Sequence, residues 1–256
     1  MPAPDVACVE EVFASLDRLT ENLEGTLGIA LSGGSDSSAL LVITAEWAKA
    51  KSRQLVAATV DHQLRPESGE EAILAGNLSK KFGIPHQVIH WDPAATGQDQ
   101  PNNLSARARE ARHQLLGAWA REQGLKAVLL GHTMDDQAET VLMRLIRGSG
   151  ADGLSAMDEK VLLKGTLWLR PILRCRRDNL RTYLTARGVG WSDDPTNQNE
   201  TYERVRIRNV IAGLKITPEG LAKTAETLGR QRQVLEIDRD RLAQEAVSIG
   251  KCGELH

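Results

Sequence analysis

A glycine-rich turn carries the sharpest chemical signal in the sequence. It follows the short apolar run 27–31 and precedes a helical pattern over about 37–51. Its residues are Ser32, Gly33, Gly34, Ser35, Asp36 and Ser37. Adjacent glycines let the backbone approach a ligand closely, hydroxyl groups add donors, and a following helix presents free N–H groups, so the turn predicts a phosphate cradle. Asp36 fits such a cradle if its carboxylate holds a divalent cation that bridges phosphates.

Two other phosphate-binding motifs are excluded. The chain contains no Gly-x4-Gly-Lys-Ser/Thr sequence. The segment 148–153 fits Gly-x-Gly-x-x-Gly, but it follows a helical pattern, whereas a dinucleotide-binding motif follows a strand. We therefore interpret 148–153 as a flexible loop beside the site.

Three carboxylates gather at the start of another helical pattern, over about 135–147. Asp135 and Glu139 are four residues apart and Asp136 and Glu139 are three apart, so all three cluster on a helix. Helix capping explains one or two acids, but not a trio directly after an apolar strand pattern. Such a cluster binds a cation, either a metal ion or the ammonium group of a substrate. His132 precedes it, where the carboxyl end of a strand faces the ligand crevice.

A pair of arginines lies on the predicted helix 104–123. Arg109 and Arg112 are three residues apart and share one face, whereas Arg107 points elsewhere. Paired guanidinium groups can clamp a phosphate or stabilise charge on a leaving group. A solvent-exposed helix with Arg/Glu pairs explains these residues equally well, so the pattern leaves both interpretations open.

The order of apolar segments predicts how these side chains come together. Strand-like runs alternate with helical patterns, which is typical of the α/β class. The expected strands are 27–31, 55–60, 86–91 and 126–130, and the expected helices are about 37–51, 67–82, 104–123 and 135–147. We expect a doubly wound, mainly parallel sheet of about five strands, with the ligand crevice at the carboxyl ends.

The pattern changes beyond residue 153. Residues 161–173 indicate strand, 177–187 a short helix, and 218–247 a long helix with leucine every seven residues. The second apolar series of a zipper is lacking, so we expect a narrow apolar stripe that leans on another element. We expect a catalytic domain over 1–215 with a basic subregion 160–215. Residues 216–256 would form a helical C-terminal extension.

Composition excludes several classes of protein. With 256 residues, 41% hydrophobic and 26% charged, the chain is typical of a globular protein. It has neither a long apolar run nor a secretory signal, which predicts no membrane span and a cytoplasmic location. Cys8, Cys175 and Cys252 are far apart and offer poor support for disulfides, zinc or an iron–sulfur cluster.

The charge distribution is uneven. Residues 160–215 contain 12 Lys/Arg and 5 Asp/Glu, a net charge of +7, whereas the whole chain carries −2. Such a basic segment indicates a local anionic partner, although on charge alone a solvated surface is the plainer interpretation.

Taken together, the motifs resemble the PP-loop family of N-type ATP pyrophosphatases. The turn 32–37 carries the likeness to the wider family. Within it, other segments resemble the tRNA(Ile)-lysidine synthases, and the longest is the most specific. These segments are 60–65, 108–113, 131–150, 170–173 and 194–197, followed by Arg204, Arg206 and Arg208. The resemblance covers about 27–211.

The resemblance implies a reaction of ATP, Mg²⁺, free L-lysine and an isoleucine tRNA with a CAU anticodon. ATP would adenylate the wobble cytidine, and the ε-amine of lysine would displace AMP to leave lysidine. Nucleotide binding would fall to Ser32, Gly33, Gly34, Ser35, Asp36, Ser37, Asp61, His62 and His132. Asp36 would also bind magnesium, and Asp36, Arg109 and Arg112 would be catalytic. Asp135, Asp136 and Glu139 would receive the lysine ammonium, and Arg174, Arg177, Arg204, Arg206 and Arg208 would contact tRNA.

Some features depart from the family pattern. His113, Thr133 and Val205 replace residues that are usual there. Many members carry further tRNA-gripping domains, so we expect a short member or a fragment, and a fragment would bind tRNA weakly while keeping ATP binding. The alternatives are a PP-loop tRNA thiolation enzyme, a small-molecule amidoligase and an ATP-dependent RNA-binding module. The oligomeric state, with a homodimer among the options, is left open.

Overall fold

The computed structural model describes residues 4–63, 68–91, 104–192, 201 and 203–246. Their contacts divide the chain into two compact units. Unit 1 comprises residues 1–136 with 159–199, and unit 2 comprises 137–158 with 200–256. The predicted segment 194–197 and Cys252 lie outside the described residues. These units are defined by contacts, whereas the boundary at residue 215 separates a catalytic domain from its C-terminal extension. That boundary therefore stays a prediction.

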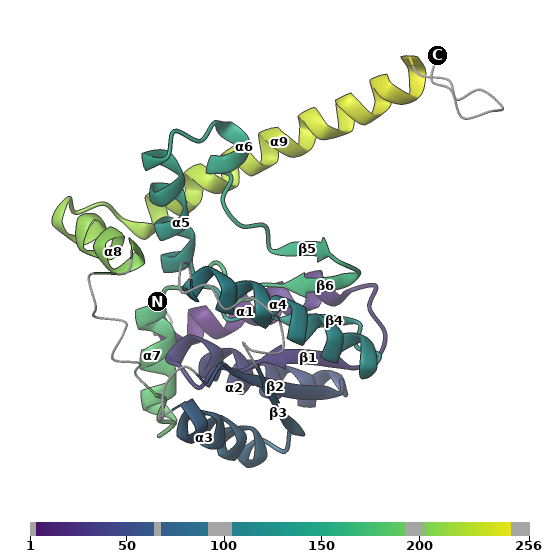
Figure 1. Cartoon of the computed structure of the whole chain (residues 1–256), viewed down its shortest axis with the longest axis vertical. Coiled ribbons are helices and arrows are strands. Elements are labelled where there is room, and N and C mark those ends of the chain that lie inside the picture. Colours follow the sequence, from purple (N-terminus) through teal and green to yellow (C-terminus); the bar gives the residue numbers. More distant parts are fainter. Residues whose placement is uncertain (1–3, 64–67, 92–103, 193–200, 202, 247–256) are drawn as a thin grey trace. The chain divides into compact units, whose positions relative to one another are not determined.

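Unit 1 is built on a six-stranded sheet with the strand order β3-β2-β1-β4-β6-β5 (Figure 1). The strands are β1 (Leu27–Ala30), β2 (Leu55–Asp61), β3 (His86–His90), β4 (Ala127–Leu129), β5 (Lys160–Leu163) and β6 (Thr166–Leu169). All neighbouring strands are parallel except β5 and β6. The predicted mainly parallel α/β sheet is therefore confirmed.

The sixth strand arises because the region predicted as one strand, 161–173, folds into a hairpin. Lys164 and Gly165 join β5 to β6, and both have positive φ, 50° and 76°. A two-residue hairpin turn of this kind needs positive φ at both positions. Lys-Gly is a weaker turn signal than Asn-Gly, so the sequence pattern concealed the turn.

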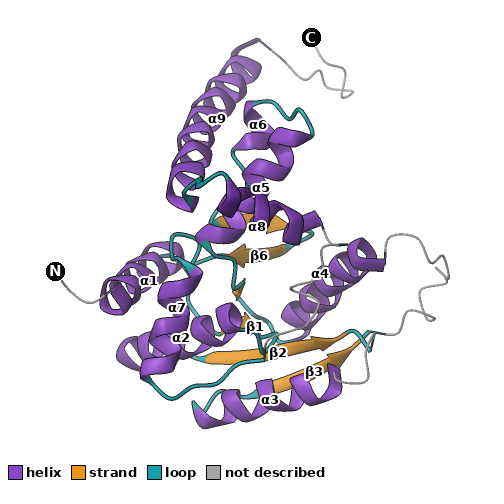
Figure 2. Ribbon diagram, turned by 90° about the vertical axis from the view of Figure 1, so that its left-hand side faces the viewer, coloured by secondary structure: helices purple, strands orange, loops and turns teal. Residues whose placement is uncertain are grey.

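Helices cover both faces of this sheet (Figure 2). They are α1 (Pro4–Thr20), α2 (Ser35–Lys51), α3 (Ser68–Lys81), α4 (Leu104–Glu122) and α7 (Arg177–Ala186). Alternate strand residues point to opposite faces. In β1, Leu27 and Ile29 pack into the cluster that contains α1, α2 and α7, whereas Ala30 packs into the cluster that contains α4. Coverage on both faces explains why the central strands β1, β2 and β4 are mainly apolar.

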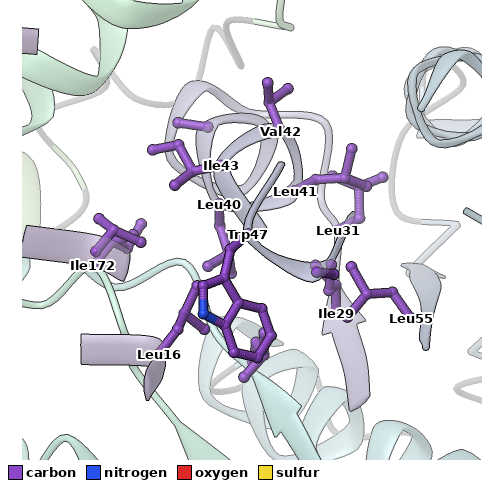
Figure 3. Close-up of a cluster of buried hydrophobic side chains, with 14 of the residues drawn as sticks. Leu16, Ile29, Leu31, Leu40, Leu41, Val42, Ile43, Trp47, Leu55 and Ile172 are labelled. Carbon is purple, nitrogen blue, oxygen red and sulfur yellow. The ribbon is translucent and has the colours of Figure 1, made fainter. Parts of the chain in front are cut away.

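The larger core cluster joins distant parts of the chain. Figure 3 shows Leu16 of α1, Trp47 of α2 and Ile29 of β1 within it, together with Ile172, which follows β6. Two buried cysteines also lie in this cluster, where the Sγ of Cys175 donates to the carbonyl oxygen of Cys8 at 3.7 Å.

Helix α5 (Met134–Ile146) begins in unit 1 and continues into unit 2, which also contains α6 (Ala151–Leu154), α8 (Glu203–Gly213) and α9 (Pro218–Ala246). Leu142 of α5 packs with Ile207 and Ile211 of α8, and Ala225 of α9 packs with Val141. The predicted loop at 148–153 is partly wrong, because α6 begins at residue 151.

The long C-terminal helix is confirmed, but its apolar stripe is only partly covered. Leu221 packs against buried neighbours within unit 2, whereas Leu235 and Leu242 are 68% and 56% exposed. Every helix in the described part of the chain is too short or too polar to cross a lipid bilayer.

Candidate active site

The glycine-rich turn connects the carboxyl end of β1 to the first turn of α2. Gly33 has φ 82°, a left-handed conformation that favours glycine. The hydroxyl of Ser37 holds the turn closed, because it accepts a hydrogen bond from the N–H of Ser32 at 3.1 Å and donates to the carbonyl of Gly34 at 3.1 Å. The sequence therefore folds locally as predicted, with the backbone of a phosphate-binding cradle at a helix N-terminus.

Gly131, which follows the end of β4, packs directly against this turn. A Cβ atom placed on Gly131 would lie 3.0 Å from both the Cα and the N of Ser37. Only a residue without a side chain permits this approach, which brings the start of α5 close to the start of α2.

Arg177, at the start of α7, links the turn to the carboxylates of α5. Its Nε donates to Asp36 at 2.8 Å, and its Nη2 donates to Asp136 at 3.2 Å. Its backbone N–H donates to Asp135 at 2.8 Å. Asp36, Asp135 and Asp136 are therefore gathered around one residue, as the sequence predicted for the acids but not for the arginine.

Asp136 also caps the helix that carries it. Its Oδ2 accepts hydrogen bonds of 2.9 Å from both the N–H and the hydroxyl of Thr133, which precedes α5. The capping function considered for these acids is thus real for Asp136, while its other oxygen faces Arg177.

Burial dominates the electrostatics of Asp36. Desolvation raises the pKa of this carboxyl above its usual value, against the opposing attraction of Arg177. The negative charge of Asp136 nearby raises the pKa further. A cation beside Asp36 therefore favours its carboxylate form.

Cationic and imidazole side chains collect near the carboxyl ends of β2, β4 and β6. His132, after β4, accepts a hydrogen bond at Nδ1 from the Nε of Arg170 at 3.1 Å. Burial, followed by the charges of Arg170, Arg112 and Arg109, lowers the pKa of His132 to about 3, against the attraction of Asp136. The charges of the predicted arginine pair on α4 therefore reach the crevice.

His62 and Asp61 end β2 in the same region. Burial and the charge of Arg112 lower the pKa of His62, and its ring meets Trp91 edge-to-face at 5.6 Å. Burial raises the pKa of Asp61, but a 2.9 Å hydrogen bond from the N–H of Gln63 and other contacts bring it below the usual value. Asp61 is therefore ionised at neutral pH.

Glu139 belongs to unit 2, one turn along α5 from Asp136. Its side chain is 2% exposed and accepts a hydrogen bond from Arg208 of α8. Arg204 and Arg206 also lie on α8, and Arg206 donates to the carbonyl of Thr201 at 2.9 Å. The structure thus supplies a cationic partner for this carboxylate within the same unit.

The basic residues of unit 1 differ from one another in their surroundings. Arg174 is half exposed and pairs with Glu11 and Glu159, whereas Arg177 is largely buried among acids. Sequence reasoning also missed Arg181, which donates to the hydroxyl of Ser35 at 3.3 Å. Its position four residues after Arg177, on the same helix face, was the available signal.

The donor set fits a magnesium ion that arrives with a nucleotide. No group of three or more His, Cys, Asp or Glu side chains forms a metal cage within the described residues. Mg²⁺ does not need such a cage, because it is usually held by one or two carboxylates, substrate phosphates and water. Asp36, beside a phosphate cradle, meets this requirement.

The family profile and the curated relatives that match this chain agree on one family. A profile of the PP-loop domain matches residues 9–214. A tRNA(Ile)-lysidine synthase of Ruegeria pomeroyi is 41% identical over 213 residues, which is 82% of this chain and 50% of that protein. Another, of Zymomonas mobilis, is 36% identical and covers 98% of this chain, which spans 74% of that protein. The chain spans 50–61% of the length of the first curated relatives that it matches.

Solved structures show the same fold at low sequence identity. A U34-tRNA thiolase of Methanococcus maripaludis, described with its 4Fe–4S cluster, superposes with a TM-score of 0.74 at 18% identity. That match covers 89% of this chain and 79% of the other. An NMN synthetase of Francisella tularensis gives a TM-score of 0.54 at 15% identity, over 90% and 94% of the two chains.

Proposed function

Since the chain belongs to the PP-loop family and, within it, to the tRNA(Ile)-lysidine synthases, we propose that it joins lysine to an isoleucine tRNA. ATP would adenylate the wobble cytidine of a tRNA with a CAU anticodon, with release of pyrophosphate. The ε-amine of free L-lysine would then displace AMP to leave lysidine. The reaction forms one C–N bond and consumes one ATP.

The gathering of acids around Arg177 is the observation that carries this proposal. Asp36 from the turn and Asp136 from α5 lie 2.8 Å and 3.2 Å from the same guanidinium. The group that would serve the nucleotide and the group that would receive the amine are therefore neighbours, as a two-step transfer requires.

ATP use follows from the family, and the turn offers a place for the phosphates. In the proposal, backbone N–H groups at the start of α2 hold the pyrophosphate half of ATP. Asp36 holds Mg²⁺, which when bound neutralises phosphate charge during cleavage. Arg109 and Arg112 stabilise the negative charge that develops in adenylation, and Asp61 and His62 flank the nucleotide.

The carboxylates of α5 suit an ammonium group. Asp135, Asp136 and Glu139 would bind the ammonium of the substrate lysine, and the neutral imidazole of His132 would donate a hydrogen bond to the nucleotide without adding charge. The arginines of α8 together with Arg174 would contact tRNA phosphates. In this proposal residues 1–215 carry the catalysis, and residues 216–256 form a helical extension that serves as a linker or as part of a tRNA-binding region. The reaction takes place in the cytoplasm.

The thiolation alternative is weaker on the described residues. Sulfur transfer of this kind generally uses paired cysteines or a cluster, whereas Cys8 and Cys175 are buried thiols of the unit 1 core. The likeness to the thiolase and to the NMN synthetase shows the fold alone.

The decisive experiment supplies ATP, Mg²⁺, lysine and a transcript of isoleucine tRNA with a CAU anticodon. We expect AMP and pyrophosphate release that depends on both lysine and RNA. Mass spectrometry of the digested RNA should show one cytidine that has gained lysine less one water. Asp36→Ala should abolish the release, while Asp178→Ala, which removes an exposed acid in the first turn of α7, should keep it.

Other outcomes would point elsewhere. Pyrophosphate release without RNA would favour the small-molecule ligase, and a nucleoside that gains sulfur would favour thiolation. ATP binding without pyrophosphate release would favour an RNA-binding module.

A further inference from the structure

Arg177 forms the centre of a buried charge cluster. Its guanidinium contacts Asp36 through Nε and Asp136 through Nη2, so one positive charge faces two negative charges. The side chains of Arg177, Asp36 and Asp136 are only 16%, 18% and 9% exposed. Water screens such charges poorly, so the two carboxylates need a cation beside them when no ligand is bound.

The same contact stands in the way of a metal ion. Oδ2 of Asp36 accepts the hydrogen bond from Arg177, and Oδ1 accepts one from the hydroxyl of Ser35 at 3.2 Å. A metal ion bound to Asp36 must take an oxygen that is now engaged. A guanidinium and a divalent cation repel each other at such a distance, so a metal ion that binds Asp36 weakens the hold of Arg177 on this carboxylate.

We propose that Arg177 is a temporary counter-ion, which pairs with the carboxylate of Asp36 until a metal-bound nucleotide displaces it. The proposal rests on the proposed function in one respect, that Asp36 is the metal-binding acid. Binding of the metal–nucleotide complex is then an exchange of one cation for another. A guanidinium on a long, flexible stem suits this role, because it can leave without disturbing the backbone.

The backbone around Arg177 is held independently of its side chain. The N–H of Arg177 donates to Asp135 at 2.8 Å, and the carbonyl of Cys175 accepts from the N–H of Met134 at the start of α5. The start of α7 thus stays attached to α5 when the guanidinium moves. The exchange requires a side-chain rotation alone.

In this exchange, Arg177 affects nucleotide affinity in opposite directions with and without metal. A nucleotide without metal is attracted by Arg177 and repelled by the acids. A metal–nucleotide complex must displace Arg177, so its apparent affinity is reduced by the fraction of molecules in which the guanidinium still occupies Asp36. Loss of Arg177 should therefore weaken metal-free binding and strengthen metal-bound binding.

The test compares dissociation constants of α,β-methylene-ATP, which resists cleavage between the α and β phosphates, in Mg²⁺ and in EDTA. We expect the metal-dependent gain in affinity to be about tenfold or more larger in Arg177→Gln than in the unchanged chain, by calorimetry on all 256 residues. The matched control is Arg187→Gln, at the other end of α7, where the arginine pairs with Glu46. Its gain should equal that of the unchanged chain.

Arg177→Lys covers the case in which Arg177→Gln does not fold. It keeps the charge, but an ammonium is a point charge without the planar fork, so its gain should fall between those of the other two. Equal weakening with and without metal in either variant would overturn the proposal and make Arg177 a phosphate ligand or a structural residue. These measurements use neither tRNA nor lysine, so a failure of lysidine formation leaves their outcome unaffected.

Discussion

His132 illustrates how burial and neighbouring charges fix the protonation state of one side chain. Its Nδ1 accepts the hydrogen bond from Arg170, which places the ring proton on Nε2. Because its pKa falls to about 3, the imidazole is neutral over the physiological range. His132 thus offers a neutral donor to a ligand.

This shift predicts a pH dependence of stability. The unfolded chain has the usual histidine pKa of 6.5 and the folded chain about 3, so the unfolded state takes up the proton first as pH falls. The contribution is complete above pH 6.5 and is lost toward pH 3, by up to about 1.4 kcal/mol per pH unit. Between pH 7 and pH 5, His132→Asn should lose about 2 kcal/mol less unfolding free energy than the unchanged chain.

Urea unfolding at the two pH values measures this difference. If His132→Asn shows the pH dependence of the unchanged chain, the low pKa of His132 is wrong.

The individual site residues could be chosen from the sequence, but not their partners. Types and spacing selected the turn, the acids of α5 and the arginines of α4. The family resemblance placed Arg177 among the tRNA contacts, whereas the structure surrounds it with Asp36, Asp135 and Asp136. These contacts join residues 41 to 141 positions apart and follow from the packing of α7, which local spacing does not encode.

At the scale of elements, the contact between the end of β4 and the start of α2 sets the shape of the turn. Gly131→Ala would place a Cβ atom 3.0 Å from the backbone of Ser37, closer than ordinary van der Waals contact. Because the added Cβ atom would meet backbone atoms, the clash is relieved only if the turn and α2 shift. We expect about tenfold weaker binding of α,β-methylene-ATP, by the same calorimetry.

The control for this prediction is Gly190→Ala, at an exposed glycine that has no neighbour within 4 Å of the added Cβ atom. It should leave nucleotide affinity unchanged. Unchanged affinity in Gly131→Ala would mean that the turn tolerates displacement and that its close packing is irrelevant to binding.

The elements themselves were only partly predictable. Apolar runs located β1, β2 and β4 because central strands covered on both faces are mainly apolar. Helix α1 was missed, although Cys8, Val12, Leu16 and Leu19 recur at helical spacing and are all buried. The β5–β6 hairpin was missed because two residues with positive φ, Lys164 and Gly165, reverse the chain without a strong turn signal.

At the scale of the whole molecule, ion pairs reduce the charge that the basic segment 160–215 presents to RNA. Arg174 pairs with Glu11 and Glu159, and Arg187 pairs with Glu46. A segment with a net charge of +7 should therefore make fewer phosphate contacts than its arginines suggest.

We expect log K for tRNA binding to fall with log salt concentration with a slope of about −2 to −4, which corresponds to a few phosphate contacts. Replacement of Arg204 and Arg206 of α8 by Gln should reduce the magnitude of the slope by about 1 to 2. Filter-binding titrations at several salt concentrations measure it. Arg241→Gln on α9 lies outside the segment and should not change the slope, and a flat response in the unchanged chain would contradict the phosphate contacts.

The burial of Cys8 and Cys175 in the unit 1 core allows the opening of that core to be measured. The two thiols are 6% and 3% exposed and come from parts of the chain 167 residues apart, the first helix and the segment that leads into α7. An alkylating reagent can reach them only when these parts separate. The rate at which the two thiols are alkylated, followed by mass spectrometry, therefore reports how often this part of the unit 1 core opens.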